Sequence, residues 1–114
     1  MRGTKLFEVS INGHIATKSV QKNTEWNDRL GTKFSNLDSF PLVRKIAIDA
    51  KFWISSKRFR ESGALDLDNL IKPVLDTMTK NNVIDDDASI FDLSITKFPT
   101  DGEQILNIIG WEWL

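Results

Sequence analysis

Apolar and polar residues alternate in four stretches of the chain, and this alternation predicts four β-strands. In "LFEVSI" the residues Phe7, Val9 and Ile11 alternate with polar ones, as in a strand with one buried face. The clearest alternation lies in "RKIAIDAKFWI", and two further strands are expected at "IFDLSITKF" and "QILNIIGWEW". The pair Asp101-Gly102 between the last two strands suits a tight hairpin turn.

Apolar residues recur at helical spacing in two other stretches. The first runs from Thr24 to about Ser39. Thr24 is a candidate N-cap, while Gly31 weakens the prediction because glycine disfavours helix. The apolar stripe of this helix consists of Trp26, Leu30, Phe34 and Leu37.

The second helix is expected from about Asp68 to Thr79, and Pro73 lies within it. Proline costs about 3 kcal/mol deep inside a helix but little in the first turn. We therefore expect Asp68 and Asn69 to form an irregular turn, and regular helix to begin near Lys72. The apolar stripe consists of Leu67, Leu70, Ile71, Val74, Leu75 and Met78.

The order of these elements is strand, helix, strand, helix, strand, strand, which predicts an α+β domain with a mixed α/β architecture. We expect a mixed sheet of about four strands packed by two helices. With 40% hydrophobic and 27% charged residues, the chain is expected to form one globular domain over residues 1–114.

Composition excludes several classes of function. The chain has no cysteine, which excludes disulfides, zinc ribbons and thiol catalysis. The single histidine, His14, excludes mechanisms that need two. No apolar run is long enough to span a membrane, and the apolar part of "MRGTKLFEVSI" is too short for a signal peptide. A cytoplasmic location is therefore expected.

Charge is distributed unevenly, although the net charge is only −1. The segment "KFWISSKRFR", interpreted as the basic end of a strand, carries four positive charges and no negative one. The segment from Asp66 to Asp87 then holds six aspartates against Lys72 and Lys80. Alternate solvated faces would explain such charge runs. A metal site is the alternative explanation of the acidic segment, and the charge run alone does not favour it.

The spacing of the aspartates favours a site. In extended backbone, Asp66 and Asp68 point to the same side, and Lys72 follows Asp68 by one helical turn. Asp86 and Asp87 approach the same place if the loop after the helix folds back. Taken alone, Asp68 is better explained as a cap of the helix.

Clustered carboxylates require a cation or protonation, because like charges about 4 Å apart repel by several kcal/mol at moderate dielectric. Oxygen ligands without histidine or cysteine favour Mg²⁺ or Mn²⁺ over zinc. A calcium-binding EF-hand is excluded, since Ile71 or Ile90 stands where its glycine is needed.

The segment "DLDNLIKPVLDTMTKNNVIDDDASIFDLSITK", Asp66 to Lys97, resembles the signature of the RusA family of Holliday junction resolvases. The shared pattern is D-x-D-N-x-x-K, an apolar helix with an aspartate, and a pair of aspartates before a strand that ends in lysine. The resemblance implies a small, intertwined homodimer with a mixed α/β fold that cuts four-way DNA junctions with Mg²⁺, or with Mn²⁺ in its place.

Carried over by position, the resemblance implies metal binding by Asp66, Asp68 and Asp87, with Asp86 as the neighbouring acid. It makes Lys72 the essential lysine. The catalytic residues would be Asp66, Asp68, Lys72 and Asp87. Asp76 is expected only to pair with Lys72 or Lys80.

The resemblance also implies contacts with DNA. The family often has arginines directly before the first aspartate, whereas here "ESGAL" stands there and the basic residues are displaced upstream. The N-terminal loop "NGHIATKSVQKN" lacks the family's proline-rich turn but supplies further cations. The expected DNA-binding residues are Lys18, Lys22, Lys57, Arg58, Arg60 and Asn69.

The sequence thus predicts a Mg²⁺-dependent, structure-specific endodeoxyribonuclease that resolves four-way junctions by symmetric nicking in recombination and repair. Two symmetric nicks require two sites related by a two-fold axis, which favours a homodimer. One alternative is a non-catalytic DNA-binding module with a structural metal. Another is a metal-dependent nuclease for flaps or forks. The apolar end "IIGWEWL" fits a core strand or a dimer interface equally well.

Overall fold

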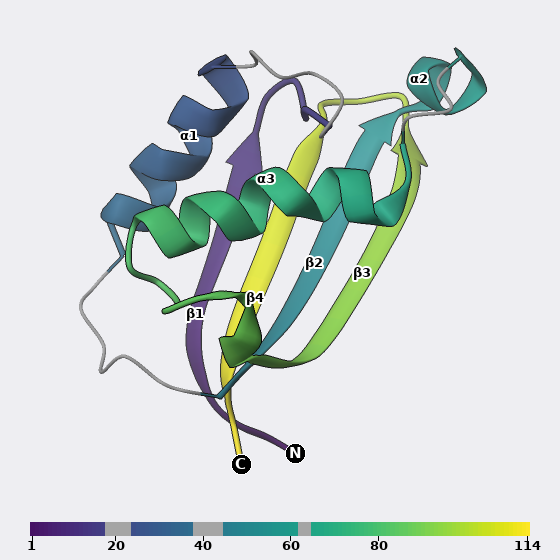
Figure 1. The fold of residues 1–114 in the computed structure, drawn as a ribbon. Coiled ribbons are helices and arrows are strands. Elements are labelled where there is room, and N and C mark those ends of the chain that lie inside the picture. Colours follow the sequence, from purple (N-terminus) through teal and green to yellow (C-terminus); the bar gives the residue numbers. More distant parts are fainter. Residues whose placement is uncertain (18–23, 38–44, 62–64) are drawn as a thin grey trace.

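The computed structural model describes residues 1–17, 24–37, 45–61 and 65–114. Over these residues the chain forms four strands, three α-helices and one 3₁₀ turn (Figure 1). The predicted α+β class and the order of the elements are confirmed, and α2 is a short additional helix. The elements are β1 (Arg2–Asn12), α1 (Thr24–Ser35), β2 (Ile46–Ser55), α2 (Ser56–Glu61), α3 (Leu67–Lys80), the 3₁₀ turn η1 (Asp87–Ser89), β3 (Ile90–Thr100) and β4 (Ile105–Trp113).

The sheet has the strand order β1-β4-β2-β3. The β4 strand is antiparallel to both β1 and β2, and the register places Ile108 between Val9 and Ala50. The β3 strand is parallel to β2. Parallel neighbours need a crossover connection, and residues 56–89 supply it. This crossover contains α2, α3 and η1.

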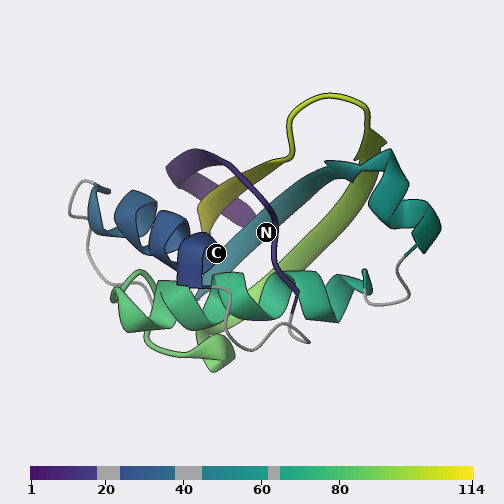
Figure 2. The same ribbon diagram turned by 90° about the horizontal axis from the view of Figure 1, so that it is seen from above.

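The predicted hairpin between the last two strands is wrong, because β2 lies between β3 and β4. The connection around Asp101-Gly102 therefore spans two strand spacings, about 10 Å, and Figure 2 shows it arching from β3 to β4. The Gly102 N–H donates to Thr100 Oγ1 at 3.1 Å. An Asp-Gly pair thus marked a turn correctly but not which strands pair.

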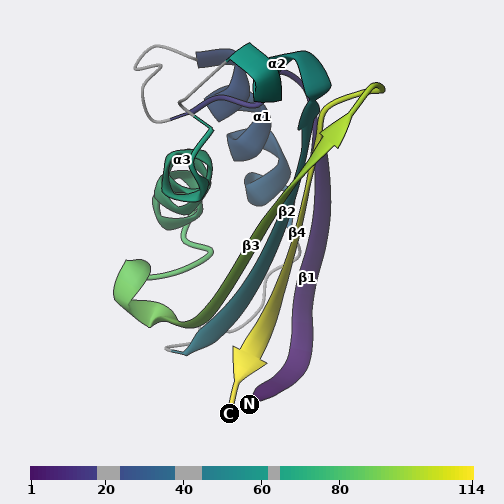
Figure 3. The same ribbon diagram turned by 90° about the vertical axis from the view of Figure 1, so that its right-hand side faces the viewer.

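One face of the sheet is covered by α1 and α3, and the opposite face carries no helix among the described residues (Figure 3). The alternation in β2 explains this: Ile48 and Phe52 point towards the helices and are fully buried, while Trp53 points to the other face and stacks on Phe98. Each large apolar side chain buried between the layers contributes about 1.5–3 kcal/mol. The helix side chains that complete the core include Trp26, Leu30, Leu70, Val74 and Met78.

Helix α3 begins earlier than predicted. Regular helix starts at Leu67, with Asp66 as the N-cap residue, and continues through Pro73, so the expected irregular turn before Lys72 is wrong. Proline inside a helix removes one hydrogen bond and costs about 3 kcal/mol. The buried apolar stripe of α3 offsets this cost. One turn beyond Pro73, the Thr77 hydroxyl donates to the Pro73 carbonyl at 2.7 Å.

The apolar C-terminal segment is a core strand on one of its faces. In β4, Leu106 and Ile108 are fully buried, and Gly110 lies beneath the buried ring of Phe7. Trp111 and Trp113 are only partly buried. None of the described helices is long and apolar enough to cross a membrane.

Candidate active site

Two exposed aspartates stand at the start of α3. Asp66 is the N-cap residue, with extended backbone (φ −66°, ψ 147°), yet its side chain does not cap the helix. Asp68 lies in the first turn, where the helix dipole favours a negative charge. The interpretation of Asp68 as the cap is therefore wrong. The helix end does not use either carboxylate as a hydrogen-bonded cap, so both can serve a ligand.

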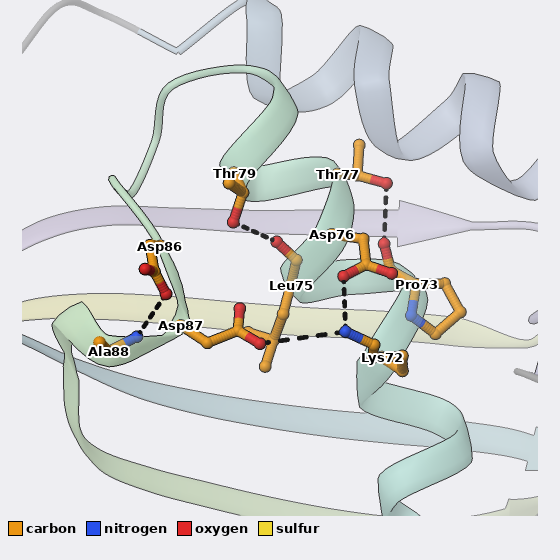
Figure 4. Close-up of polar contacts among 9 residues, drawn as sticks. All are labelled: Lys72, Pro73, Leu75, Asp76, Thr77, Thr79, Asp86, Asp87 and Ala88. Atoms are coloured by element: carbon orange, nitrogen blue, oxygen red, sulfur yellow. Dashed lines mark hydrogen bonds and ion pairs between the residues drawn. The ribbon is translucent and has the colours of Figure 1, made fainter.

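Lys72 joins α3 to the 3₁₀ turn η1. Its ammonium group donates to Asp76 Oδ1 at 2.9 Å and lies 4.0 Å from Asp87 Oδ2 (Figure 4). The hydrogen bond that Lys72 donates to Asp76 and the negative charges of Asp76 and Asp87 raise the pKa of Lys72 above its ordinary value. Lys72 therefore carries a full positive charge at neutral pH. The expected pairing of Asp76 is observed, and its partner is Lys72.

The loop after α3 folds back as the spacing required. Asp86 is the N-cap residue of η1, where its Oδ1 accepts a hydrogen bond from the Ala88 N–H at 2.8 Å. This short turn sets the next residue, Asp87, with its carboxylate towards Lys72 (Figure 4). Asp86 thus has one oxygen engaged in holding the loop, and Asp87 is the acid that reaches α3.

Helical spacing sets Asp68, Lys72 and Asp76 on one face of α3, and Asp87 reaches that face from η1. In the part of the chain that the structure describes, no three acidic or histidine side chains lie close enough to form a metal-binding group. The cation that neutralises the acids in this arrangement is the ammonium group of Lys72.

Lys72 also lies at the edge of a groove between α1 and α3. The groove has a volume of about 810 Å³ and a polar lining with both signs of charge, since Asp28 and Asp76 line it together with Lys72 and Lys80. Because opposite charges balance here, the groove itself shows no preference for a cation or an anion.

The basic residues after β2 belong to a separate helix, α2, and not to the end of the strand as expected. Lys57 and Arg60 are exposed on it. Arg58 is half-buried: its guanidinium donates to Gln104 Oε1 at 2.8 Å, and burial lowers its pKa. Gln104 also accepts from the Ser55 N–H at 3.2 Å. Arg58 thus fastens α2 to the β3–β4 connection.

Of the other expected DNA contacts, Asn69 is partly buried in the first turn of α3. Lys18 and Lys22 lie outside the described residues. His14 is exposed.

The sequence pattern assigned no role to Lys97, although it is the last residue of the motif that runs from Asp66 to Lys97. Its ammonium group donates to the Leu65 carbonyl at 2.7 Å and lies 5.6 Å from the ring centroid of Phe59. A hydrogen bond from a charged donor contributes about 1.5–3 kcal/mol. The signal was present: Ile95 and Lys97 alternate onto the same face of β3, so Lys97 is a lysine at a position that faces the helices.

The fold and the site define a class of protein. Lys72 is paired with an aspartate from a folded-back loop, two exposed aspartates stand at the start of the same helix, and a basic helix lies nearby. This combination suits chemistry on a polyanion.

The family model of the endodeoxyribonuclease RusA matches residues 4–108 of the 114-residue chain. The chain therefore belongs to the RusA family, which confirms the resemblance in its motif. This membership indicates an endodeoxyribonuclease that acts on Holliday junctions, and hence on branched DNA. A search among curated protein sequences finds no match to the chain.

Proposed function

We propose that this protein is a Mg²⁺-dependent endonuclease that resolves four-way DNA junctions by symmetric nicking during recombination and repair. The observation that carries the proposal is the meeting of Lys72 with Asp87, one turn beyond Asp68 on the same face of α3. A lysine with a raised pKa among exposed carboxylates, in a chain of an endodeoxyribonuclease family, is suited to a reacting phosphodiester.

Asp66, Asp68 and Asp87 would hold the metal, with Asp86 beside them. Because no three of these carboxylates stand close together in the described structure, the exposed side chains would have to turn towards a common point to do so. Their donor set fits Mg²⁺, or Mn²⁺ in its place, because it consists of hard carboxylate oxygens and the described part of the site contains neither histidine nor cysteine. When bound, the metal would bind phosphate oxygens and lower the pKa of a water molecule.

Lys72 would act on the phosphate itself. Its ammonium group is a compact charge on an exposed stem, held towards the acids by Asp76 and Asp87. As negative charge builds up on the phosphate or on the leaving oxygen, a cation already in place stabilises that charge without rearrangement. Because the pKa of Lys72 is raised, it acts as a fixed charge and not as a proton donor.

The DNA backbone would run past α2. Lys57 and Arg60 are exposed, and the sequence of α2 contains three basic residues against one acidic one. Arg58 can contribute charge from its half-buried position while it holds the helix in place. Asn69, Lys18 and Lys22 remain proposed DNA contacts from the family resemblance.

Symmetric nicking motivates a homodimer, because two equivalent cuts need two sites related by a two-fold axis. The intertwined arrangement and the cytoplasmic location remain proposals, made on the family resemblance and on composition.

A cleavage assay tests the proposed function. A four-way junction and a linear duplex of the same sequence are each incubated with the protein, with and without Mg²⁺. We expect nicks only in the junction and only with the metal. Asp68→Asn should abolish cleavage yet leave junction binding intact or tighter, because it removes a ligand and a negative charge. Asp85→Asn, at an exposed neighbouring acid, is the matched control and should cut normally.

The same assay separates the alternatives. Binding without cleavage in both Mg²⁺ and Mn²⁺ would favour a non-catalytic module. Faster cleavage of a flap or a fork than of the junction would favour the other nuclease. Unfolding of Asp68→Asn would indicate that Asp68 serves the helix and not a metal.

A further inference from the structure

The side chain of Lys97 links three parts of the fold. It leaves β3 next to Phe52 in the register, on the face of the sheet that the helices cover. Its ammonium group donates to the Leu65 carbonyl at 2.7 Å and lies 5.6 Å from the ring centroid of Phe59. One side chain thus contacts α2 and the backbone just before α3.

The contact with Leu65 falls at a sensitive point. Leu65 is buried, with only 3% of its surface exposed, and Asp66 follows it directly. The Asp66 carbonyl accepts the first hydrogen bond of α3, from the Leu70 N–H at 3.0 Å. Lys97 therefore holds the last peptide before the helix, and the position of this peptide sets where Asp66 and Asp68 stand.

We propose that Lys97 is a positioning residue: it holds the first turn of α3 so that Asp66 and Asp68 present their carboxylates to a divalent cation. The inference rests on the proposed function, in which these two aspartates are ligands. It goes beyond that function by assigning the geometry of the ligands to a side chain on β3, which acts through the Leu65 carbonyl.

Lysine suits this position for two reasons. Its four-carbon stem crosses from the sheet to the helix layer, and its compact cation serves a carbonyl oxygen and the face of an aromatic ring together. Through Phe59 the same cation contacts α2. The basic helix and the two aspartates are thereby held by a common support, although residues 62–64 separate them in the chain.

Direct metal binding tests the inference. Mn²⁺ binding to the full chain is measured by electron paramagnetic resonance of the free ion, without DNA. Lys97→Met keeps the apolar stem but removes the hydrogen bond. We expect it to weaken Mn²⁺ binding about tenfold, the lower end of the effect of removing outer-shell support. The metal concentration for half-maximal junction cleavage should rise by the same factor. The rate at saturating metal should change little.

Two variants serve as controls. Lys45 also lies over a phenylalanine ring, Phe91 at 5.3 Å, but at the opposite end of β2 and β3. Lys45→Met should therefore bind Mn²⁺ like the wild type. Lys97→Arg keeps a charged donor for the Leu65 carbonyl and should recover most of the affinity. Thermal unfolding confirms that each variant is folded, and Lys97→Gln replaces Lys97→Met if the latter does not fold.

The outcomes separate this inference from the proposed function. Wild-type Mn²⁺ affinity in Lys97→Met, together with abolished binding in Asp68→Asn, would overturn the role of Lys97 and leave the metal site standing. If Asp68→Asn and the wild type bind Mn²⁺ equally, or if neither binds it, both the role of Lys97 and the proposed metal site would be overturned. Weakened binding by Lys45→Met to the same degree would reduce Lys97 to a general contribution to stability, and so would overturn its positioning role.

Discussion

Lys72 has two acidic partners, and they suggest different roles for it. Asp76 is a neighbour on the same helix at 2.9 Å, a common pairing on exposed helix faces. Asp87 comes from another element and lies at 4.0 Å, a distance at which a hydrogen bond is absent but attraction remains. If Lys72 served only the helix, the contact with η1 would have no purpose. If Lys72 acts on a phosphate, Asp76 and Asp87 together fix the position of its ammonium group.

Replacement of Lys72 by alanine distinguishes these roles. We expect a variant that folds and binds junction DNA but cleaves on the order of 100-fold more slowly, the scale of removing one preorganised electrostatic interaction. Lys72→Arg should not fully restore the rate, because a planar guanidinium cannot replace a compact ammonium group. Single-turnover cleavage at saturating protein measures both. Lys80→Ala is the control, because Lys80 lies on the same helix and lines the same groove as Lys72.

The raised pKa of Lys72 leads to a prediction about pH. Below its ordinary value of 10.5 the lysine is protonated in folded and unfolded chains alike, so its pairing with Asp76 is fully present. The pairing disappears only as the pH rises through the still higher pKa of the folded chain. We expect no fall in cleavage rate from Lys72 between about pH 7 and pH 10. An alkaline fall in that range that disappears in Lys72→Arg would contradict this.

Part of the site could be predicted from residue spacing. The aspartates and Lys72 stood out, and the return of Asp87 to α3 was anticipated as a condition. The first residue of the helix was harder to predict, because Asp66 and not Asp68 is the N-cap residue. Whether proline is tolerated depends on how much apolar surface the rest of the helix buries, and that is settled by packing and not by local sequence. The contact of Lys97 with Leu65 spans 32 positions and has no local signal except its inward-facing position.

At the scale of elements, the basic residues of α2 fall into two groups: those proposed to bind DNA and one that holds the helix in place. Lys57 and Arg60 are exposed, whereas Arg58 holds Gln104. Changing all three to alanine should weaken junction binding and flatten its salt dependence. Changing only Lys57 and Arg60 should reduce the slope of log K against log salt by about 0.9 for each phosphate that is no longer neutralised. Fluorescence anisotropy at several salt concentrations measures the slope.

The matched control replaces Lys5 and Lys45, two exposed lysines at the other end of the sheet. Their double alanine variant should keep the wild-type slope. An unchanged slope in the variant of α2 would remove this helix from the DNA interface. A separate Arg58→Ala variant should lower thermal stability, because it leaves Gln104 without its charged partner.

Two glycines predict opposite effects on stability. In α1, a methyl group at Gly31 would meet only Asn81 Nδ2, at 3.9 Å. Gly31→Ala should therefore raise the free energy of unfolding by about 0.5–1 kcal/mol. In β4, a methyl group at Gly110 would overlap the ring of Phe7. Gly110→Ala should lower stability by about 1–3 kcal/mol. Urea unfolding measures both, and a destabilised Gly31→Ala would show that the groove cannot hold a methyl group.

At the scale of the whole molecule, the fold class and the order of elements could be predicted from the sequence. Apolar residues recur clearly every two residues in the strands and every three to four residues in the helices. The pairing of strands was not. A short Asp-Gly connection predicted a hairpin, but β2 lies between β3 and β4. All four strands have an apolar face, so alternation alone does not say which edges meet. The crossover through α3 brings β3 parallel to one edge of β2, and β4 pairs with the other edge of β2 instead of with β3.

The proposed homodimer predicts how mixed subunits behave. If each subunit cuts one strand, a dimer with one wild-type and one Lys72→Ala subunit should nick a junction once and stop. Co-expression with two affinity tags isolates this dimer, and gel analysis of end-labelled junctions counts the nicks. Sedimentation gives the oligomeric state. A monomer that nicks both strands in one encounter would contradict the proposal.

The parallel pairing of β2 with β3 has a consequence for how the molecule assembles. The β4 strand pairs antiparallel with β1 and β2, but β3 can take its place only after residues 56–89 have crossed the sheet. Closing such a loop costs chain entropy before any contact repays it. The candidate active site lies entirely within this crossover, so it would be completed late in folding. A local opening that frees β3 would also release Leu65 from Lys97, and the candidate active site would lose this support before the rest of the sheet melts.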